Sequence, residues 1–180
     1  MQKIRVADVV IKYLEKLGIK TVFTVTGGGA MFLNDACAGS KIIKTVCNHH
    51  EQACAMAADA YSRIKKKPAV VCVTTGPGGI NAINGVFGAY TDSTPMIILS
   101  GQVKRSTNMV IQKKGKLRQL GDQENDISYM VKKITKKTLL IKNKNDLVKN
   151  FNNLIKLSIS GRPGPVWVDI PVDIQGEKIK

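Results

Sequence analysis

Apolar residues follow two alternating patterns along the chain, one typical of buried strands and one typical of amphipathic helices. Short runs rich in β-branched residues predict strands at residues 21–26, 42–46, 69–74, 96–100, 138–141 and 166–170. Apolar residues at helical spacing predict helices within residues 3–17, 30–38, 52–64, 80–89, 126–137 and 144–160. Strands that alternate with helices and short glycine turns indicate an α/β fold, in which helices cover both faces of a parallel sheet.

One segment interrupts this alternation. Residues 103–123 are polar and basic, and they contain Gly115 and Gly121. We expect a long excursion over the surface, because loops of this length in compact domains are usually functional or mobile.

Composition narrows the class of protein. The chain has 180 residues, of which 43% are hydrophobic, which suits one globular domain with a core. No apolar stretch reaches the roughly 18 residues that a membrane helix needs. The N-terminus lacks a basic segment followed by an apolar core, so we see no secretory signal and expect a cytoplasmic protein that does not bind membranes.

The cysteines and histidines do not form a metal-ligand pattern. We expect reduced, buried thiols at the four cysteines, because none has C-x-x-C spacing: Cys37, Cys47, Cys54 and Cys72. Neighbouring His49 and His50 would point to opposite faces of a strand, and no second cluster completes a site. We therefore expect no metal ligands in this chain.

The formal net charge of +15 raises the hypothesis of nucleic-acid binding. The excess is mostly lysine, in runs such as residues 65–67 and 113–116 that are spread along the chain. No aromatic residues interleave with these runs, and no groove-reading motif is present. We expect a solvated surface, or compensation by an acidic partner domain, and no nucleic-acid partner.

Glu51 stands where a predicted strand meets an alanine-rich predicted helix. A carboxylate in the first turn of a helix can simply interact with the unpaired N–H groups there, or it can be catalytic. A second strand-to-helix junction follows at residues 75–79, with the sequence TGPGG. Both junctions would lie at the carboxyl edge of a parallel sheet, which is where such folds bind ligands.

Four segments of the chain carry a resemblance to a known family: residues 48–63, 73–82, 88–103 and 161–173. They resemble the pyrimidine-binding (PYR) domain of thiamine-diphosphate-dependent enzymes of the acetolactate synthase and pyruvate decarboxylase group. The similarity runs from about residue 4 to residue 173, and its several long motifs occur in the family's order. It implies a three-layer α/β sandwich with a mostly parallel, six-stranded sheet and helices on both faces.

The resemblance also implies a role for Glu51. In that family the equivalent glutamate hydrogen-bonds N1′ of the cofactor's aminopyrimidine ring, and the resulting proton transfer activates thiamine diphosphate. This role requires a carboxyl group in a dry pocket that can share a proton with a weak ring base. The cofactor carries the carbanion chemistry, and the protein supplies orientation and electrostatics.

Further site residues follow from the same resemblance. The turn near the aminopyrimidine corresponds to Thr75, Gly76, Pro77 and Gly78. Asn81 follows at the family's spacing and is expected to hydrogen-bond in or beside that turn, or else to be an ordinary polar residue near the end of a helix. Gln102 matches a glutamine on the substrate side of the thiazolium, with a solvent-facing turn residue as the alternative. The glycine turn after the first strand, near the reacting centre, corresponds to Gly27 and Gly28.

Three positions depart from the acetolactate synthase pattern. Thr26 replaces a proline, Met56 replaces a histidine found in many synthases, and Asp122 replaces an aromatic residue before Gln-Glu. These departures leave the expected cofactor unchanged but put the identity of the substrate in doubt.

The chain lacks one part of the family's machinery. Family members bind the cofactor's diphosphate through Mg²⁺ in a separate domain with a Gly-Asp-Gly motif, and no such sequence occurs here. We expect a pyrimidine-binding domain at residues 1–175 and a polar tail or start of a linker at residues 176–180. The active site would then form with the diphosphate-binding domain of a second chain, in a homodimer or larger assembly. The chain is either a fragment of a longer enzyme, which we favour, or a small subunit of the sulfopyruvate decarboxylase type.

Three functions stay open at this point. The chain resembles part of a synthase that decarboxylates a 2-keto acid and transfers the carbanion to a second carbonyl compound. The alternative is a 2-keto acid decarboxylase or its small subunit. The third, of a different class, is a non-catalytic assembly domain, although such a domain would have no need of Glu51.

Overall fold

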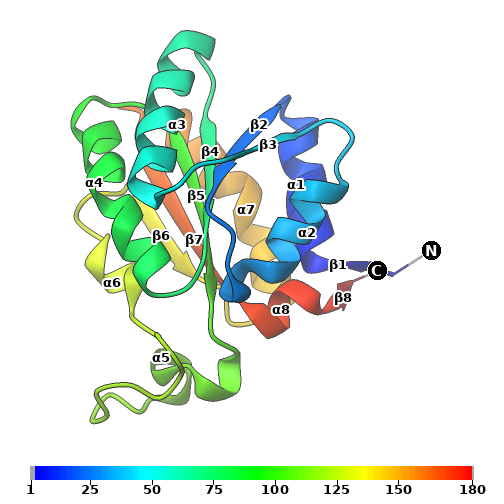
Figure 1. The fold of residues 1–180 in the computed structure, drawn as a ribbon, viewed down its shortest axis with the longest axis vertical. Coiled ribbons are helices and arrows are strands. Elements are labelled where there is room, and N and C mark those ends of the chain that lie inside the picture. Colours follow the sequence, from blue (N-terminus) through cyan, green and yellow to red (C-terminus); the bar gives the residue numbers. More distant parts are fainter. Residues whose placement is uncertain (1–2, 180) are drawn as a thin grey trace.

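A parallel sheet of six strands forms the centre of the protein (Figure 1). The computed structural model describes residues 3–179. The strands lie in the order β3-β2-β4-β5-β7-β6, and every neighbouring pair is parallel. Their bounds are β2 Thr21–Thr24, β3 Lys44–Cys47, β4 Ala69–Val73, β5 Met96–Gln102, β6 Lys137–Leu140 and β7 Pro165–Pro171. The predicted six-stranded α/β sheet is confirmed.

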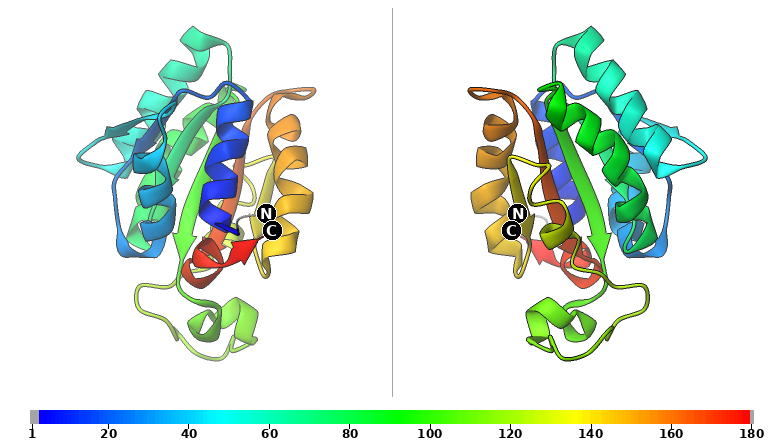
Figure 2. Two further views of the ribbon diagram at one scale, coloured as in Figure 1. Left: turned by 90° about the vertical axis from the view of Figure 1, so that its right-hand side faces the viewer. Right: turned by 90° about the vertical axis from the view of Figure 1, so that its left-hand side faces the viewer.

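Helices cover both faces of the sheet, which gives three layers (Figure 2). One face carries α1 Val6–Lys16, α2 Met31–Gly39, α7 Lys144–Ile159 and α8 Val172–Gly176. The other carries α3 Glu51–Lys65, α4 Pro77–Thr91 and α6 Ile127–Met130. Side chains alternate along each strand, so Val168 of β7 packs on the first face and Trp167 on the second. The predicted three-layer sandwich is confirmed.

Two details of the prediction are wrong at the edge of the sheet. The strand expected at residues 42–46 begins later, at Lys44, and as an edge strand it is only partly buried. Cys47, at the end of that strand, is exposed, whereas the other three cysteines are buried. Burial raises the pKa of Cys37 to about 12 and that of Cys54 to about 11, so these two thiols stay protonated at neutral pH.

Several short elements extend the predicted set. Two-residue strands β1 Ile4–Arg5 and β8 Lys178–Ile179 pair antiparallel, so the segments near the two ends of the chain lie side by side (Figure 1). The expected tail at residues 176–180 thus contains a strand, and its last residue lies outside the described part. The excursion after β5 contains a 3₁₀ turn, Arg105–Thr107, and a short helix, α5 Met109–Gln112.

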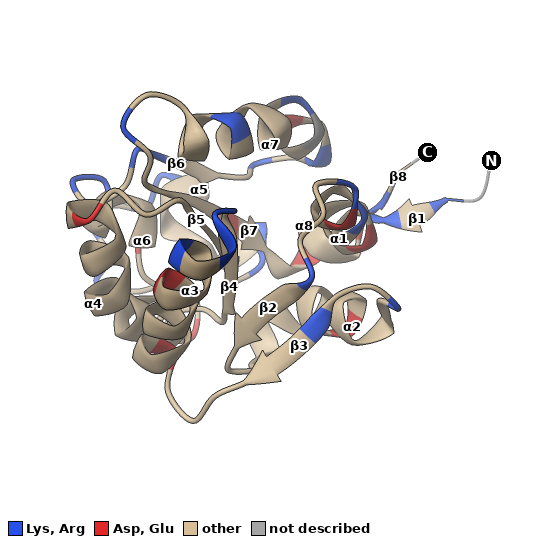
Figure 3. Cartoon of the chain, turned by 90° about the horizontal axis from the view of Figure 1, so that it is seen from above, with Lys and Arg blue, Asp and Glu red and all other residues tan. Residues whose placement is uncertain are grey.

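The basic residues are dispersed rather than gathered. Figure 3 shows Lys and Arg on α1, α3, α7 and β3, on both faces of the sheet. None of the helices within residues 3–179 is long and apolar enough to cross a membrane. In the same range, no three His, Cys, Asp or Glu side chains are grouped as metal ligands.

Helices α3 and α4 pack unusually close together. A Cβ atom added at Gly85 of α4 would lie 2.5 Å from the Cβ atom of Ala55 on α3. Small residues at this contact therefore set the separation of the two helices. This separation matters for the site, because α3 and α4 begin at its edge.

We predict that Gly85→Ala destabilises the protein, although alanine favours helix. The added methyl group has no room, and overpacking costs about 1–3 kcal/mol. Gly88→Ala on the same helix is the control, since no atom lies within 4 Å of its added Cβ. That control should stabilise by about 0.5–1 kcal/mol. Urea unfolding of both variants measures the difference, and equal effects would contradict the packing argument.

Candidate functional site

The predicted site residues lie at the carboxyl edge of the sheet. The glycine turn follows β2, Glu51 follows β3, the Gly-Pro-Gly turn follows β4, and Gln102 ends β5. Because all these strands are parallel, the segments after them meet at one edge, as the sequence predicts. The excursion, expected at residues 103–123, spans residues 103–125 in the structure and extends from the same edge (Figure 1).

Glu51 is the first residue of α3 and is only 8% exposed. His50 caps the helix, as its Nδ1 accepts a hydrogen bond from the backbone N–H of Gln52. Asn81 of α4 donates from Nδ2 to Oε2 of Glu51 over 2.9 Å. Of the two predicted alternatives for Asn81, the structure shows a hydrogen-bonding partner of Glu51.

Gly78 lies directly against the other carboxylate oxygen. A Cβ atom added at Gly78 would lie 3.3 Å from Oε1 of Glu51 and 2.9 Å from Cγ2 of Thr74. Glycine at this position therefore leaves the face of the carboxyl group uncovered. Glu51, Gly78 and Asn81 form one cluster, which we call the carboxyl cluster.

The turn before α4 is fixed by its backbone. Gly76 has φ +62° and ψ −115°, a conformation that residues with side chains rarely adopt, and Pro77 occupies the first turn of the helix. A Cβ atom at Gly76 would lie 2.1 Å from the carbonyl oxygen of Gln123. The excursion thus returns to the sheet in direct contact with this turn.

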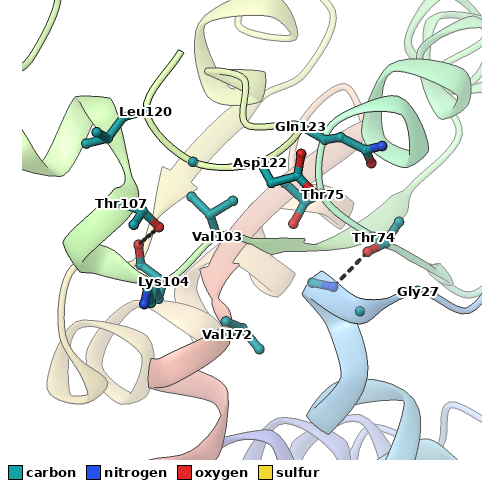
Figure 4. Close-up of a pocket in the computed structure, with 13 residues that line it drawn as sticks. Gly27, Thr74, Thr75, Val103, Lys104, Thr107, Leu120, Asp122, Gln123 and Val172 are labelled. Carbon is teal, nitrogen blue, oxygen red and sulfur yellow. Dashed lines mark hydrogen bonds between the residues drawn. The ribbon is translucent and has the colours of Figure 1, made fainter.

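A cavity of about 640 Å³ opens beside the carboxyl cluster (Figure 4). Three of its lining residues were predicted as site residues: Gly27, Gly28 and Thr75. Gly29 of the same glycine turn also lines the cavity. Sequence reasoning missed the others, most of which come from the excursion: Thr74, Val103, Lys104, Thr107, Leu120, Gly121, Asp122, Gln123 and Val172. The length of the excursion was a signal, because long loops are usually functional or mobile. Without the fold, however, the sequence could not show which of its residues line the cavity.

Thr74 and Thr75 join the cavity to the turn after β4. The backbone N–H of Gly29 donates to Oγ1 of Thr74 over 3.0 Å (Figure 4). Oγ1 of Thr75 is buried and has no hydrogen-bond partner within the described residues. A buried hydroxyl without a partner is uncommon in proteins, and at a cavity wall it is available to a ligand.

Gln102 is buried at the end of β5. It is 1% exposed, so the solvent-facing alternative is wrong, and it does not line the cavity. Its Nε2 donates to the carbonyl of Asn125 and to Asp169, and its Oε1 accepts from the backbone N–H of Val103. Its role on the substrate side stays a prediction.

The excursion is anchored by charged side chains. The carboxylate of Glu124 accepts backbone hydrogen bonds from Met109, Leu120 and Gly121. Arg105 bonds Asp173 over 2.7 Å and Glu177 over 2.5 Å. Lys104 beside it forms no ion pair within residues 3–179, so a free cation lines the cavity.

The arrangement combines two chemical capabilities. The carboxyl cluster offers a shielded carboxylate, oriented by one amide donor, with an uncovered face over Gly78. Such a group can hold a proton against a ligand heteroatom. The neighbouring cavity offers backbone groups, an unpartnered hydroxyl and a cation, which suit a small anionic molecule.

Comparison with known proteins agrees with the motifs. Residues 4–126 match the family model described as thiamine pyrophosphate enzyme, N-terminal TPP binding domain. The chain is 36% identical over 172 residues to acetolactate synthase 3, chloroplastic, of Brassica napus, covering 94% of this chain and 24% of that protein. It is 35% identical over 180 residues to the acetolactate synthase large subunit of Haemophilus influenzae, covering all of this chain and 30% of that protein. The chain therefore spans less than a third of the length of these relatives.

We predict that Gly76→Ala loosens the excursion. The substitution forces an alanine to positive φ, which costs about 1–3 kcal/mol, and places its methyl group against the backbone of Gln123. Trypsin should cleave the variant faster at the lysines of residues 113–116. Gly115→Ala is the control, since its Cβ meets no atom within 4 Å, and it should change stability by less than about 0.5 kcal/mol. Unchanged cleavage in Gly76→Ala would contradict the contact.

Proposed function

The chain belongs to the thiamine pyrophosphate enzyme family, as an acetolactate synthase-like N-terminal TPP binding domain, and we propose that it binds the aminopyrimidine ring of thiamine diphosphate beside Glu51. The observation that carries this proposal is the carboxyl cluster. Glu51 is shielded, held by Asn81 and uncovered on the side of Gly78. A cap for α3 needs none of these features, because His50 already fills that role.

The residues present fit a flat ring with polar edge atoms. Glycine at position 78 lets the backbone lie against Glu51, so no side chain of this residue separates a ring from the carboxyl group. The backbone of this turn provides polar groups for the ring's edge, and Thr75 and Asn81 flank it. Gly27 and Gly28 line the neighbouring cavity, where the reacting part of the cofactor and the substrate would lie.

Glu51 is proposed to hold a proton at ring atom N1′. A hydrogen bond from Asn81 to Oε2 leaves Oε1, the oxygen beside Gly78, to face the ring. When bound, thiamine diphosphate supplies the nucleophilic carbon that attacks a carbonyl substrate. Glu51, by sharing the proton, tunes the ring that activates this carbon.

The diphosphate group and its Mg²⁺ are proposed to bind outside this chain, in the diphosphate-binding domain of a second chain. Nothing in residues 3–179 offers a set of metal ligands, and the acetolactate synthases that this chain matches are three to four times longer. In this proposal, residues 1–175 form the pyrimidine-binding half of a shared site. Isolated, the chain should turn over no substrate.

An exposed apolar face supports a partner at this site. Five large apolar residues on α3 and α4 are 40% or more exposed: Met56, Ile64, Ile80, Phe87 and Tyr90. These helices begin at the carboxyl cluster, so a domain docked on them would close the site from outside. We propose that this face binds the partner chain in a homodimer or larger assembly.

The substrate is proposed to be a 2-keto acid, which the complete enzyme decarboxylates before it transfers the carbanion to a second carbonyl compound. The similarity to acetolactate synthases supports this reaction class. Lys104 supports an acidic substrate, because it lines the cavity and its ammonium group has no ion-pair partner within residues 3–179. A substrate carboxylate can therefore bind there. Thr26 and Met56, which depart from the synthase pattern, argue for a substrate pair that differs from that of the synthases.

We predict that Glu51→Gln abolishes cofactor activation without unfolding the protein. The glutamine carbonyl can still accept from Asn81, but it cannot share a proton. With the diphosphate-binding partner, thiamine diphosphate and Mg²⁺, the rate of C2-proton exchange and of pyruvate consumption should fall by about 10²–10⁴-fold. NMR measures the exchange, and product analysis for acetolactate, acetaldehyde and carbon dioxide separates synthase from decarboxylase.

Asp59→Asn on the same helix is the matched control. It removes the same charge from a residue whose carboxylate pairs with Arg63 at the surface. Its exchange rate should equal that of the unmodified protein. Full exchange activity in Glu51→Gln would show that the chain is an assembly domain or that another residue moves the proton.

We predict that Phe87→Lys weakens association with the partner. A charge placed in a buried apolar interface is costly to desolvate, so the dissociation constant should rise by at least about tenfold. Ile159→Lys is the control, because Ile159 is as exposed as Phe87, each at 52%, but lies on α7 across the sheet. Sedimentation analysis of both variants provides the comparison. If the two variants associate equally well, the partner binds elsewhere.

A further inference from the structure

Asp169 is a buried carboxyl group that the proposed function does not use. It lies near the end of β7, is 2% exposed and forms no ion pair within the described residues. It shares a face of the sheet with Trp167, and it is paired in register with Ser100 of β5. It therefore faces the layer that contains α3, α4 and α6.

Two hydrogen-bond donors converge on this carboxyl group. Oγ of Ser100 donates to Oδ1 of Asp169 over 2.6 Å, and Nε2 of Gln102 donates to Oδ2 over 2.9 Å. Nε1 of Trp167 donates in turn to Oγ of Ser100 over 2.8 Å. Each carboxyl oxygen thus accepts one bond, which matches the ionised form, because the protonated form could donate to Ser100 only if that hydroxyl reversed its own bond.

Gln102 connects Asp169 to both ends of the excursion. Its Nε2 also donates to the carbonyl of Asn125 over 3.0 Å, and its Oε1 accepts from the N–H of Val103 over 2.9 Å. Val103 and Asn125 are the first and last residues of the excursion. One side chain therefore holds the base of the segment that forms most of the cavity wall.

The protonation state of Asp169 changes near neutral pH. Burial raises the pKa of Asp169 to about 7, against the opposing effect of the bonds from Ser100 and Gln102. The carboxylate of Asp126, before α6, contributes to the increase. Helix α4 carries no Asp, Glu, Lys, Arg or His.

The elements of this layer carry charged groups of both signs, since α3 has Arg63 and Lys65 in its last turn. Glu51 begins α3, and the segment before α6 carries Asp122 and Glu124 as well as Asp126. Tyr129 of α6 is exposed to solvent. No basic side chain on these elements offsets the burial of Asp169 by pairing with it.

We propose that Asp169, when ionised, is a positioning residue that holds Gln102 and so fixes the excursion over the cavity. Protonation of Asp169 replaces its charge-assisted bond from Gln102 with a weaker neutral one, and the base of the excursion loosens. The bearing of this contact on catalysis rests on the proposed function, whereas the positioning itself does not. Access to the cavity is thereby coupled to pH near neutrality.

Coupling between the ionisation of Asp169 and the excursion predicts a pH dependence that a purely structural role of Asp169 would not produce. A carboxyl group with a raised folded-state pKa stabilises the fold most at low pH, and this contribution is lost as pH rises from the unfolded value of 3.8 to about 7. Protection of the excursion should instead increase as pH rises through about 7, where the folded-state carboxyl ionises and binds Gln102 more strongly. Global stability and local protection therefore change in opposite directions.

Hydrogen exchange of the chain without cofactor tests the proposal. After correction for intrinsic rates, protection of the Val103 amide should rise on the order of tenfold between pH 6 and pH 8, as expected for a charge-assisted bond. In Asp169→Asn, protection should be low at both pH values, since a neutral amide offers Gln102 only an uncharged acceptor. Protection that does not depend on pH in the unmodified chain, or that keeps its pH dependence in Asp169→Asn, overturns the proposal.

A second variant keeps the test decisive if Asp169→Asn fails to fold. Asp126→Asn retains a helix-capping side chain but removes the carboxylate that raises the pKa of Asp169. Fluorescence of Trp167, the single tryptophan, should titrate with a midpoint near 7 that moves to lower pH in this variant. An unmoved midpoint contradicts the proposal. Neither hydrogen exchange nor tryptophan fluorescence involves Glu51 or the cofactor. A negative result in these experiments therefore does not contradict the proposed function, and failure of the proposed function does not contradict the role of Asp169.

Discussion

The close contact between α3 and α4 is the interaction on which the site depends. Ala55 lies one turn after Glu51 on α3, and Gly85 lies one turn after Asn81 on α4. Because Ala55 and Gly85 have almost no side chain between them, the helices approach closely enough for Asn81 to reach Glu51. A larger residue at the contact would separate the donor from the carboxylate. Packing one turn away from the chemistry thus sets the orientation of the group that performs it.

The turn after β4 serves two neighbouring regions. Strand β4 lies between β2 and β5 in the sheet, so the segments after these three strands meet at its carboxyl end. Thr75 of this turn lines the cavity, whereas Gly78 lies against Glu51. In the proposed function, proton handling and substrate binding are thereby placed on either side of one short segment. The excursion lines the cavity, and none of the three residues of the carboxyl cluster does.

The sequence was sufficient for most of the fold and part of the site. Runs of β-branched residues and glycine turns predict the sheet, because burial on both faces imposes a pattern that needs no long-range information. Glu51 and Gly78 follow from local motifs. The environment of Gln102 could not be predicted from a local motif. Its partner Asp169 lies 67 residues away and is brought near only by the register of β5 and β7. Asn81 was uncertain for the same reason, as its bond to Glu51 depends on helix separation. The strand β8 was missed because a two-residue pairing leaves no periodic signal.

The central claim is that Glu51 meets the pyrimidine ring of the cofactor. A structure of the chain assembled with its diphosphate-binding partner and thiamine diphosphate tests it most directly. The account predicts that a carboxyl oxygen of Glu51 lies within hydrogen-bond distance of ring atom N1′, about 2.6–3.2 Å, with the ring against Gly78. A ring bound away from Glu51, or a Glu51 carboxyl group whose only partner is Asn81, would contradict the account.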